Sequence, residues 1–139
     1  MDRKNHRVLV VDDDEVALTA MVDLLEDSGY QVQAVTSPVG IADAAESDPE
    51  LRALVVDLHL PVVRGDNIVR IFRSRTFLRN LPVIMVSGDS RANLRKVQEH
   101  MPSVEIVSKS ELEEHLVATV DRAICASLAR SRPPRPWEG

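Results

Sequence analysis

The sequence predicts an α/β domain with a doubly wound, five-stranded parallel sheet and five helices. Short runs rich in β-branched residues recur five times, and each is separated from the next by a segment with helical spacing. Strict alternation of strand and helix implies parallel strands, right-handed crossovers and helices on both faces of the sheet. The first, third and fourth runs are almost entirely apolar, which is typical of central strands that are buried on both sides.

The predicted strands follow the chain at regular intervals. They are residues 7–11 (RVLVV), 30–35 (YQVQAV), 53–57 (ALVVD), 81–87 (LPVIMVS) and 104–108 (VEIVS).

The helices carry their own start and stop signals. Asp14 is placed to cap the first helix, which ends near Gly29. Ser37 is predicted to cap the second, with Pro38 at its first helical position. In the last helix, Ser110 and Glu113 have the spacing of a capping box. The apolar stripe of this helix comprises Leu112, Leu116, Val120, Ile124 and Leu128, and Cys125 is expected in the core beside it.

Composition limits the class of protein. The 139 residues suit one domain, and the aromatic share of 3% requires an aliphatic core. The net charge of -5 argues against a general nucleic-acid surface. A single cysteine and the lack of a long apolar run favour a soluble, cytoplasmic protein. We expect residues 1–129 to form the domain and residues 130–139 to be a flexible Arg/Pro-rich tail or the start of a linker.

Polar residues stand where four of the predicted strands end: Asp12 and Asp13, then Asp57, Ser87 and Lys109. The carboxyl ends of parallel strands share one edge of a sheet, so these groups should meet there. Two carboxylates about 4 Å apart repel by about 4 kcal/mol at an effective dielectric of about 20, which predicts a cation between them. Oxygen ligands without histidine or cysteine favour magnesium. With a lysine and a hydroxyl opposite, the pocket suits a phosphoryl group, and Asp57 is a candidate nucleophile.

These motifs also carry a family resemblance. The ordered set VVDDD, VVDLHLP…G, VIMVSG and VSK resembles the receiver domain of bacterial two-component response regulators over roughly residues 6–129. The resemblance implies a flavodoxin-like fold with strand order 2-1-3-4-5. It also implies that Asp57 accepts a phosphoryl group from a histidine kinase, and that magnesium is bound by Asp12, Asp13, Asp57 and the backbone carbonyl of His59.

The resemblance assigns further roles and shows departures. Ser87 and Lys109 would contact the phosphoryl group, and Gly88 would leave space for it. Ile106 stands where relatives carry Tyr or Phe, so the switch region of Ser87, Gly88 and Ile106 lacks the usual aromatic ring. Ser110 replaces a proline, which predicts a trans Lys109–Ser110 peptide.

His59 and Asp89 occupy the positions two residues after Asp57 and Ser87, where relatives tune the lifetime of the phosphoryl group. The direction of their effect is left open.

These residues allow three functions. The first is a phosphoaccepting receiver in a phosphorelay, with a histidine kinase or phosphotransfer protein and a downstream protein as partners. We expect such a receiver to have no membrane partner, and we identify no DNA-binding module in this chain. A dimer is possible for this function. The second is a degenerate receiver that binds proteins without phosphate, or nucleotides through the tail arginines and Trp137. A phosphohydrolase ranks last because residue 59 is His rather than an acid. We therefore expect no enzyme beyond assistance to its own phosphorylation and dephosphorylation.

Overall fold

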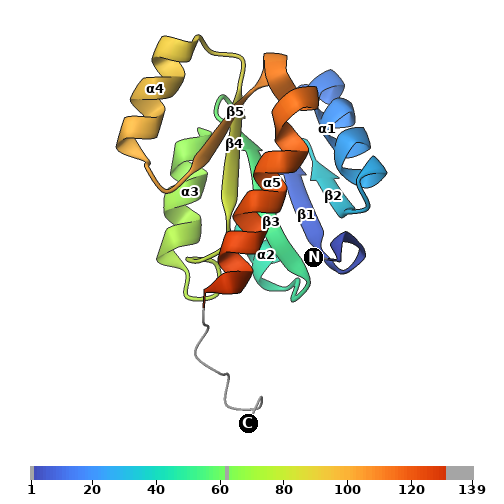
Figure 1. The fold of residues 1–139 in the computed structure, drawn as a ribbon. Helices are drawn as coiled ribbons and strands as arrows, with labels where there is room; N and C mark the ends of the chain where they lie inside the picture. Colours follow the sequence, from blue (N-terminus) through green and yellow to red (C-terminus); the bar gives the residue numbers. More distant parts are fainter. Residues whose placement is uncertain (1, 62, 131–139) are drawn as a thin grey trace.

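The computed structural model describes residues 2–61 and 63–130. Within this part of the chain, one parallel sheet has five strands in the order β2-β1-β3-β4-β5 (Figure 1). This arrangement confirms the predicted fold class and strand order. The strands are β1 (Arg7–Val11), β2 (Gln31–Val35), β3 (Leu51–Asp57), β4 (Val83–Ser87) and β5 (Glu105–Ser108). Each overlaps a predicted strand, with ends shifted by two residues at most.

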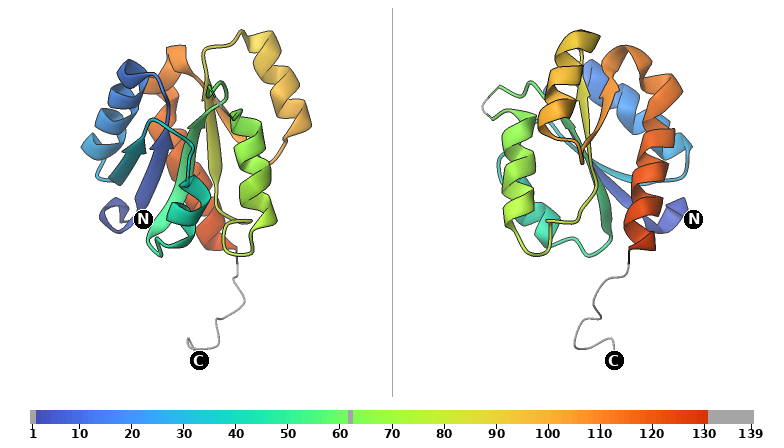
Figure 2. Two further views of the ribbon diagram at one scale, coloured as in Figure 1. Left: turned by 180° about the vertical axis from the view of Figure 1, so that it is seen from behind. Right: turned by 60° about the vertical axis from the view of Figure 1, so that its left-hand side comes forward.

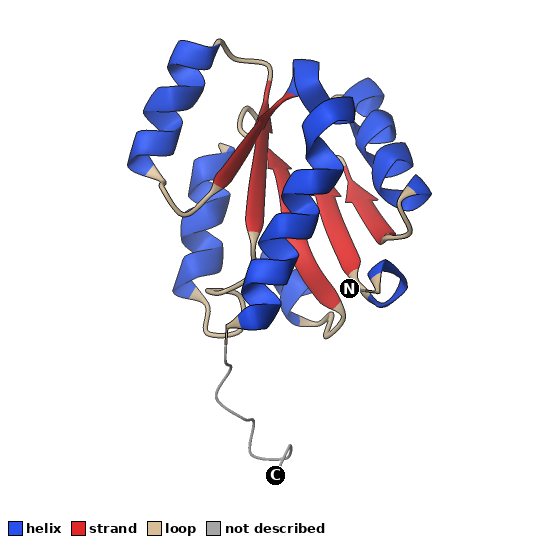
Figure 3. Ribbon diagram, viewed as in Figure 1, coloured by secondary structure: helices blue, strands red, loops and turns tan. Residues whose placement is uncertain are grey.

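Helices cover both faces of the sheet. They are α1 (Glu15–Asp27), α2 (Ile41–Glu46), α3 (Gly65–Ser74), α4 (Arg91–His100) and α5 (Leu112–Ala129), with 3-10 turns η1 (Arg3–Asn5) and η2 (Lys109–Glu111). Helices α1 and α5 lie on one face, and α2, α3 and α4 lie on the other (Figures 2 and 3). None of the described helices is long and apolar enough to span a membrane.

The sheet separates two aliphatic cores. Beneath α1 and α5, Met21 and Leu116 pack against alternate residues of the central strands. On the opposite face, Phe72 of α3 is fully buried against Leu54 and Met85. Strand β3 therefore supplies side chains to both cores, which explains why its sequence is a continuous apolar run.

The helix starts were predicted with mixed success. Asp14 caps α1 and accepts a hydrogen bond from the Val16 backbone N–H at 3.0 Å, as predicted. The start predicted for α2 is wrong. The Ser37 hydroxyl instead accepts from the Val39 N–H at 3.2 Å and forms a tight turn. The helix begins only after Gly40, whose φ of 73° is in the left-handed region that favours glycine.

The capping box predicted for α5 is also wrong. Ser110 lies inside η2, and the preceding Ser108 is the residue whose side chain accepts from the Ser110 N–H. Leu128, which was expected in the buried stripe of α5, is 44% exposed in the last turn of the helix. Cys125 is exposed as well, since it is rotated about 100° from Ile124 in the buried stripe. The described residues contain no cis peptide bond, which confirms the predicted trans Lys109–Ser110 peptide.

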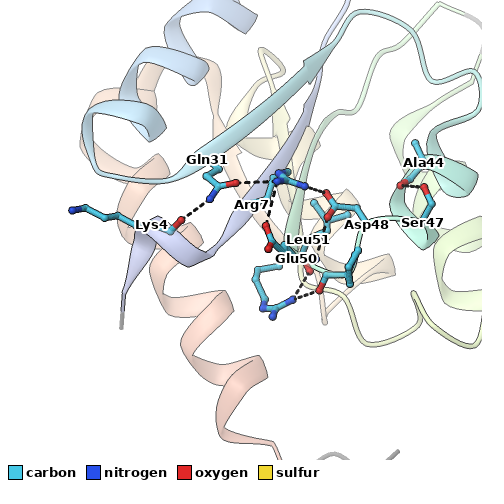
Figure 4. A network of polar contacts seen from close by, with 10 residues as sticks. Lys4, Arg7, Gln31, Ala44, Ser47, Asp48, Glu50 and Leu51 are labelled. Carbon is cyan, nitrogen blue, oxygen red and sulfur yellow. Dashed lines mark hydrogen bonds and ion pairs between the residues drawn. The ribbon is translucent and has the colours of Figure 1, made fainter. Parts of the chain in front are cut away.

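A polar network ties the amino-terminal edge of the sheet together (Figure 4). Arg7, the first residue of β1, donates to Asp48 at 2.7 Å and to Glu50 at 3.3 Å in the loop before β3. It also donates to Gln31 of β2 at 3.0 Å, and Gln31 in turn donates to the Lys4 carbonyl. At this edge, opposite the predicted site, the ion pairs and hydrogen bonds of Arg7 link β1 to β2 and to the loop before β3.

Candidate functional site

The strand ends converge at the carboxyl edge of the sheet, which is the upper edge in Figures 1 and 3. Asp12 directly follows β1 and is held against β2 by the bond from its N–H to the Val35 carbonyl at 3.2 Å. Asp57 is the last residue of β3, and Ser87 is the last residue of β4. Lys109 follows β5 as the first residue of η2. The parallel sheet therefore positions the predicted residues at one edge.

The three acidic side chains form a compact group. Carboxylate oxygens of Asp12, Asp13 and Asp57 all lie within 4.8 Å of one another. Asp12 is fully buried and Asp57 is 4% exposed, whereas Asp13 lies on the surface. Like charges at this separation repel strongly away from water, so the group needs a positive partner.

Lys109 is one such partner. Its Nζ lies 2.8 Å from Asp12 Oδ2 and 3.4 Å from Asp57 Oδ2. Burial alone would lower the pKa of Lys109, but the hydrogen bond to Asp12 and the charges of Asp57 and Asp12 raise it above its ordinary value. The lysine is therefore charged at neutral pH and bridges the ends of three strands.

The acidic group still carries excess negative charge. Asp12 Oδ1 accepts from the Asp14 backbone N–H at 2.9 Å. Asp12 Oδ2 is buried and makes no hydrogen bond of regular geometry, although Lys109 Nζ is close to it. Burial raises the pKa of Asp12, with the Lys109 bond acting in the opposite direction. The three carboxylates offer oxygen ligands, and one ammonium does not balance their charge. The group therefore fits a divalent cation such as magnesium.

Ser87 and Gly88 form the side of the site contributed by β4. Ser87 is fully buried, and its Oγ accepts from the Asp89 N–H at 3.0 Å. Within the described residues, this hydroxyl donates no hydrogen bond, so its proton is available to a ligand. A Cβ placed on Gly88 would meet no atom within 4 Å, so the backbone here borders open space.

A contact between His59 and Asp89 was not anticipated. His59 Nε2 lies 2.7 Å from Asp89 Oδ2, which links the loops after β3 and β4. Each loop is also anchored locally, because the His59 N–H donates to Asp57 Oδ1 at 3.3 Å and the Asp89 N–H donates to Ser87 Oγ at 3.0 Å. The available signal was that each residue stands two positions after a site residue. The sequence singled out both positions but did not show that they pair.

Ile106 differs from the charged residues of the site because its side chain packs against apolar neighbours. It pairs in register with Met85 of β4 and is half-buried, packed against the core on the α3 side of the sheet. The surroundings of its side chain in the described residues are therefore apolar.

Curated relatives match parts of the chain. It is 33% identical over 88 residues to the two-component response regulator-like APRR1 of Arabidopsis thaliana, covering 63% of this chain and 14% of that protein. It is also 33% identical over 82 residues to the polar-differentiation response regulator DivK of Brucella ovis, covering 58% of this chain and 65% of DivK. The chain thus corresponds to only a part of each of these relatives.

Solved structures and the family profile agree. A sensor protein from Polaromonas sp. JS666 matches with a TM-score of 0.78 and 25% identity, covering 88% of this chain and 98% of that one. The profile of the response regulator receiver domain matches residues 8–121, well over half of the sequence. The chain therefore belongs to the response regulator receiver domain family.

Proposed function

We propose that this receiver domain accepts a phosphoryl group on Asp57 and thereby changes the surface that it offers to a protein partner. The donor is a phosphohistidine of a histidine kinase or phosphotransfer protein in the cytoplasm. The observation that carries the proposal is the close grouping of the Asp57 carboxylate with Asp12, Asp13 and the charged Lys109. A structural ion pair alone would not need two further acids beside it.

The transfer is a simple displacement at phosphorus. A carboxylate oxygen of Asp57 attacks, an acyl phosphate bond forms, and the phosphorus–nitrogen bond of the donor breaks, with the electron pair leaving on the imidazole. Lys109 offsets the charge of the phosphoryl oxygens, and the Ser87 hydroxyl donates a hydrogen bond to one of them. Bound magnesium supplies positive charge that lets an anionic donor approach the carboxylates.

Four groups are assigned to the magnesium site in this proposal. The carboxylates of Asp12, Asp13 and Asp57 and the backbone carbonyl of His59 would hold the ion. Support comes from the grouping of three carboxylates, of which those of Asp12 and Asp57 are buried, around the single ammonium of Lys109. The chain assists only its own phosphorylation and dephosphorylation, so it is not an enzyme acting on a separate substrate.

Intact-mass spectrometry with magnesium and acetyl phosphate tests the proposal. The expected result is a single phosphoryl adduct that disappears in Asp57→Asn and when magnesium is chelated. Asp23→Asn is the matched control, because this exposed carboxylate on α1 lies outside the acidic group and should leave the adduct unchanged.

Failure has a defined meaning. If neither acetyl phosphate nor histidine kinases of the host phosphorylate the folded protein, the receiver acts as a phosphate-independent binding module. An adduct that persists in Asp57→Asn would assign phosphorylation to another residue and reject the assigned acceptor.

A further inference from the structure

A groove of about 820 Å³ runs between α3 and α4, on the face of the sheet opposite α5. The left view of Figure 2 shows the two helices as neighbours on that face. Strand-end residues of the phosphorylation site precede both helices in the chain, but the groove is lined by side chains of α3 and α4, by Arg64 and by the segment 101–104 that follows α4. Its residues have no role in the function proposed above.

The groove is positively charged although the chain as a whole is acidic, with a net charge of -5. Arg70, Arg73 and Lys96 line it, and none of them forms an ion pair with an acid of the described residues. The acid in the groove, Asp66, is already paired with Arg64 at 3.2 Å. By contrast, an acid pairs with each of Arg3, Arg7, Arg75, Arg91 and Arg122.

The guanidinium of Arg73 is held in place by backbone hydrogen bonds. Its Nη1 donates to the carbonyl oxygens of Leu81 at 2.9 Å and Arg79 at 3.0 Å, which orders the guanidinium at the end of α3. Burial lowers the pKa of Arg73, and the charge of Arg130 lowers it further. A negative group beside Arg73 would therefore relieve an existing electrostatic cost.

The floor of the groove is aliphatic. Val69 and Val104 are buried there, and Val97 and Met101 are partly exposed. Methionine adapts to different apolar shapes, which suits a binding surface. None of the residues that line the groove is Phe, Tyr or Trp, and His100 is the one aromatic ring among them, so the lining is mainly aliphatic and cationic. An aliphatic ligand with negative charges complements these features best.

We propose that the groove between α3 and α4 binds an acidic amphipathic helix of a partner protein. Leucine-like side chains at helical spacing would pack on Val97 and Met101, and flanking Asp or Glu side chains would pair with Arg70 and Lys96. Binding does not require a phosphoryl group on Asp57, so this proposal and the proposed phosphorylation can fail independently.

A designed peptide provides the test. The probe is a fluorescein-labelled amphipathic helix of about five turns, roughly 18 residues, with Leu on one face and Glu elsewhere. Its binding to the unphosphorylated full chain is followed by fluorescence anisotropy. Charge reversal in the double variant Arg70→Glu/Lys96→Glu should weaken binding about tenfold or more.

Arg95→Glu is the matched control. Arg95 is an exposed cation on α4 that does not line the groove and forms no ion pair within the described residues. Its reversal should change the dissociation constant within about twofold. Backbone amide shifts in an NMR titration should map to α3 and α4, and thermal melts verify that every variant is folded.

Several results would overturn the proposal. One is equal binding of a peptide with the same composition but scrambled order, because a helix face would then be irrelevant. Another is an equal loss in Arg95→Glu, which would indicate general charge attraction. Displacement of the probe by ATP at comparable concentration would assign the groove to nucleotides. Self-association that is abolished by Arg70→Glu/Lys96→Glu would assign it to a second copy of this chain.

Discussion

Replacing Gly65 with alanine tests the contact between the start of α3 and the end of β3. A Cβ at residue 65 would lie 2.6 Å from the Asp57 carbonyl oxygen and 3.0 Å from the Leu58 Cα. Both neighbours are backbone atoms, which cannot rotate away as a flexible side chain can. Either α3 or the strand end that carries Asp57 must therefore shift.

The size of the effect follows from two opposing contributions. Overpacking of this kind costs about 1–3 kcal/mol. Alanine recovers about 0.4–1 kcal/mol by reducing the freedom of the unfolded chain. The contact is severe, so the overpacking contribution dominates, and we expect a net loss of about 1–2 kcal/mol in the free energy of unfolding. For a domain of this size, the corresponding fall in Tm is about 3–8 °C.

Urea and thermal unfolding followed by circular dichroism measure this loss, with Gly88→Ala as the control. A Cβ on Gly88 meets no atom within 4 Å, so its stability should stay within about 0.5 kcal/mol of the wild type. Gly65→Ala should also slow the phosphorylation by acetyl phosphate, because displacing the backbone carbonyl of Asp57 also moves the side chain that accepts the phosphoryl group. Wild-type stability of Gly65→Ala, or an equal loss in Gly88→Ala, would refute the reasoning.

Three further predictions concern the cap, pH and magnesium. Asp14→Ala should lower the free energy of unfolding by about 1 kcal/mol while Asp14→Asn retains most of it, and equal urea midpoints would contradict the capping role. Burial alone would raise the pKa of Asp121, but hydrogen bonds from Arg3 and Tyr30 lower it below its ordinary value. The stabilising contribution of Asp121 is thus present above the ordinary carboxyl pKa and is lost as the pH falls through the folded-state value. Between about pH 5 and pH 3, the free energy of unfolding measured in urea should therefore decrease less steeply for Asp121→Asn than for the wild type. Magnesium at about 100 times its dissociation constant should stabilise the wild type by about 2.7 kcal/mol, and Asp13→Asn should need more magnesium for the same shift in Tm; a shift identical in both proteins would exclude Asp13 as a ligand.

The elements that were predicted well depend on local sequence. Each strand is a short β-branched run whose burial follows from its own residues, so β1, β3 and β4 were recognisable without knowledge of their neighbours. The start of α2 was not, because the Ser37 hydroxyl could equally cap a helix or close a turn. Ser110 was misassigned as a cap because its spacing to Glu113 did not reveal the intervening turn η2.

The residues that form the acidic group, and the lysine that pairs with it, could be identified from the amino-acid sequence alone. Parallel strands bring their carboxyl ends to one edge, so residues at successive strand ends become neighbours whatever the details of packing. The contact of His59 with Asp89 became visible only in the folded chain, as did the groove that collects cations of α3 and α4 for which the described residues provide no acidic partner. Those contacts depend on loop conformation and on how two helices pack side by side, and neither is encoded in the periodicity of a single segment.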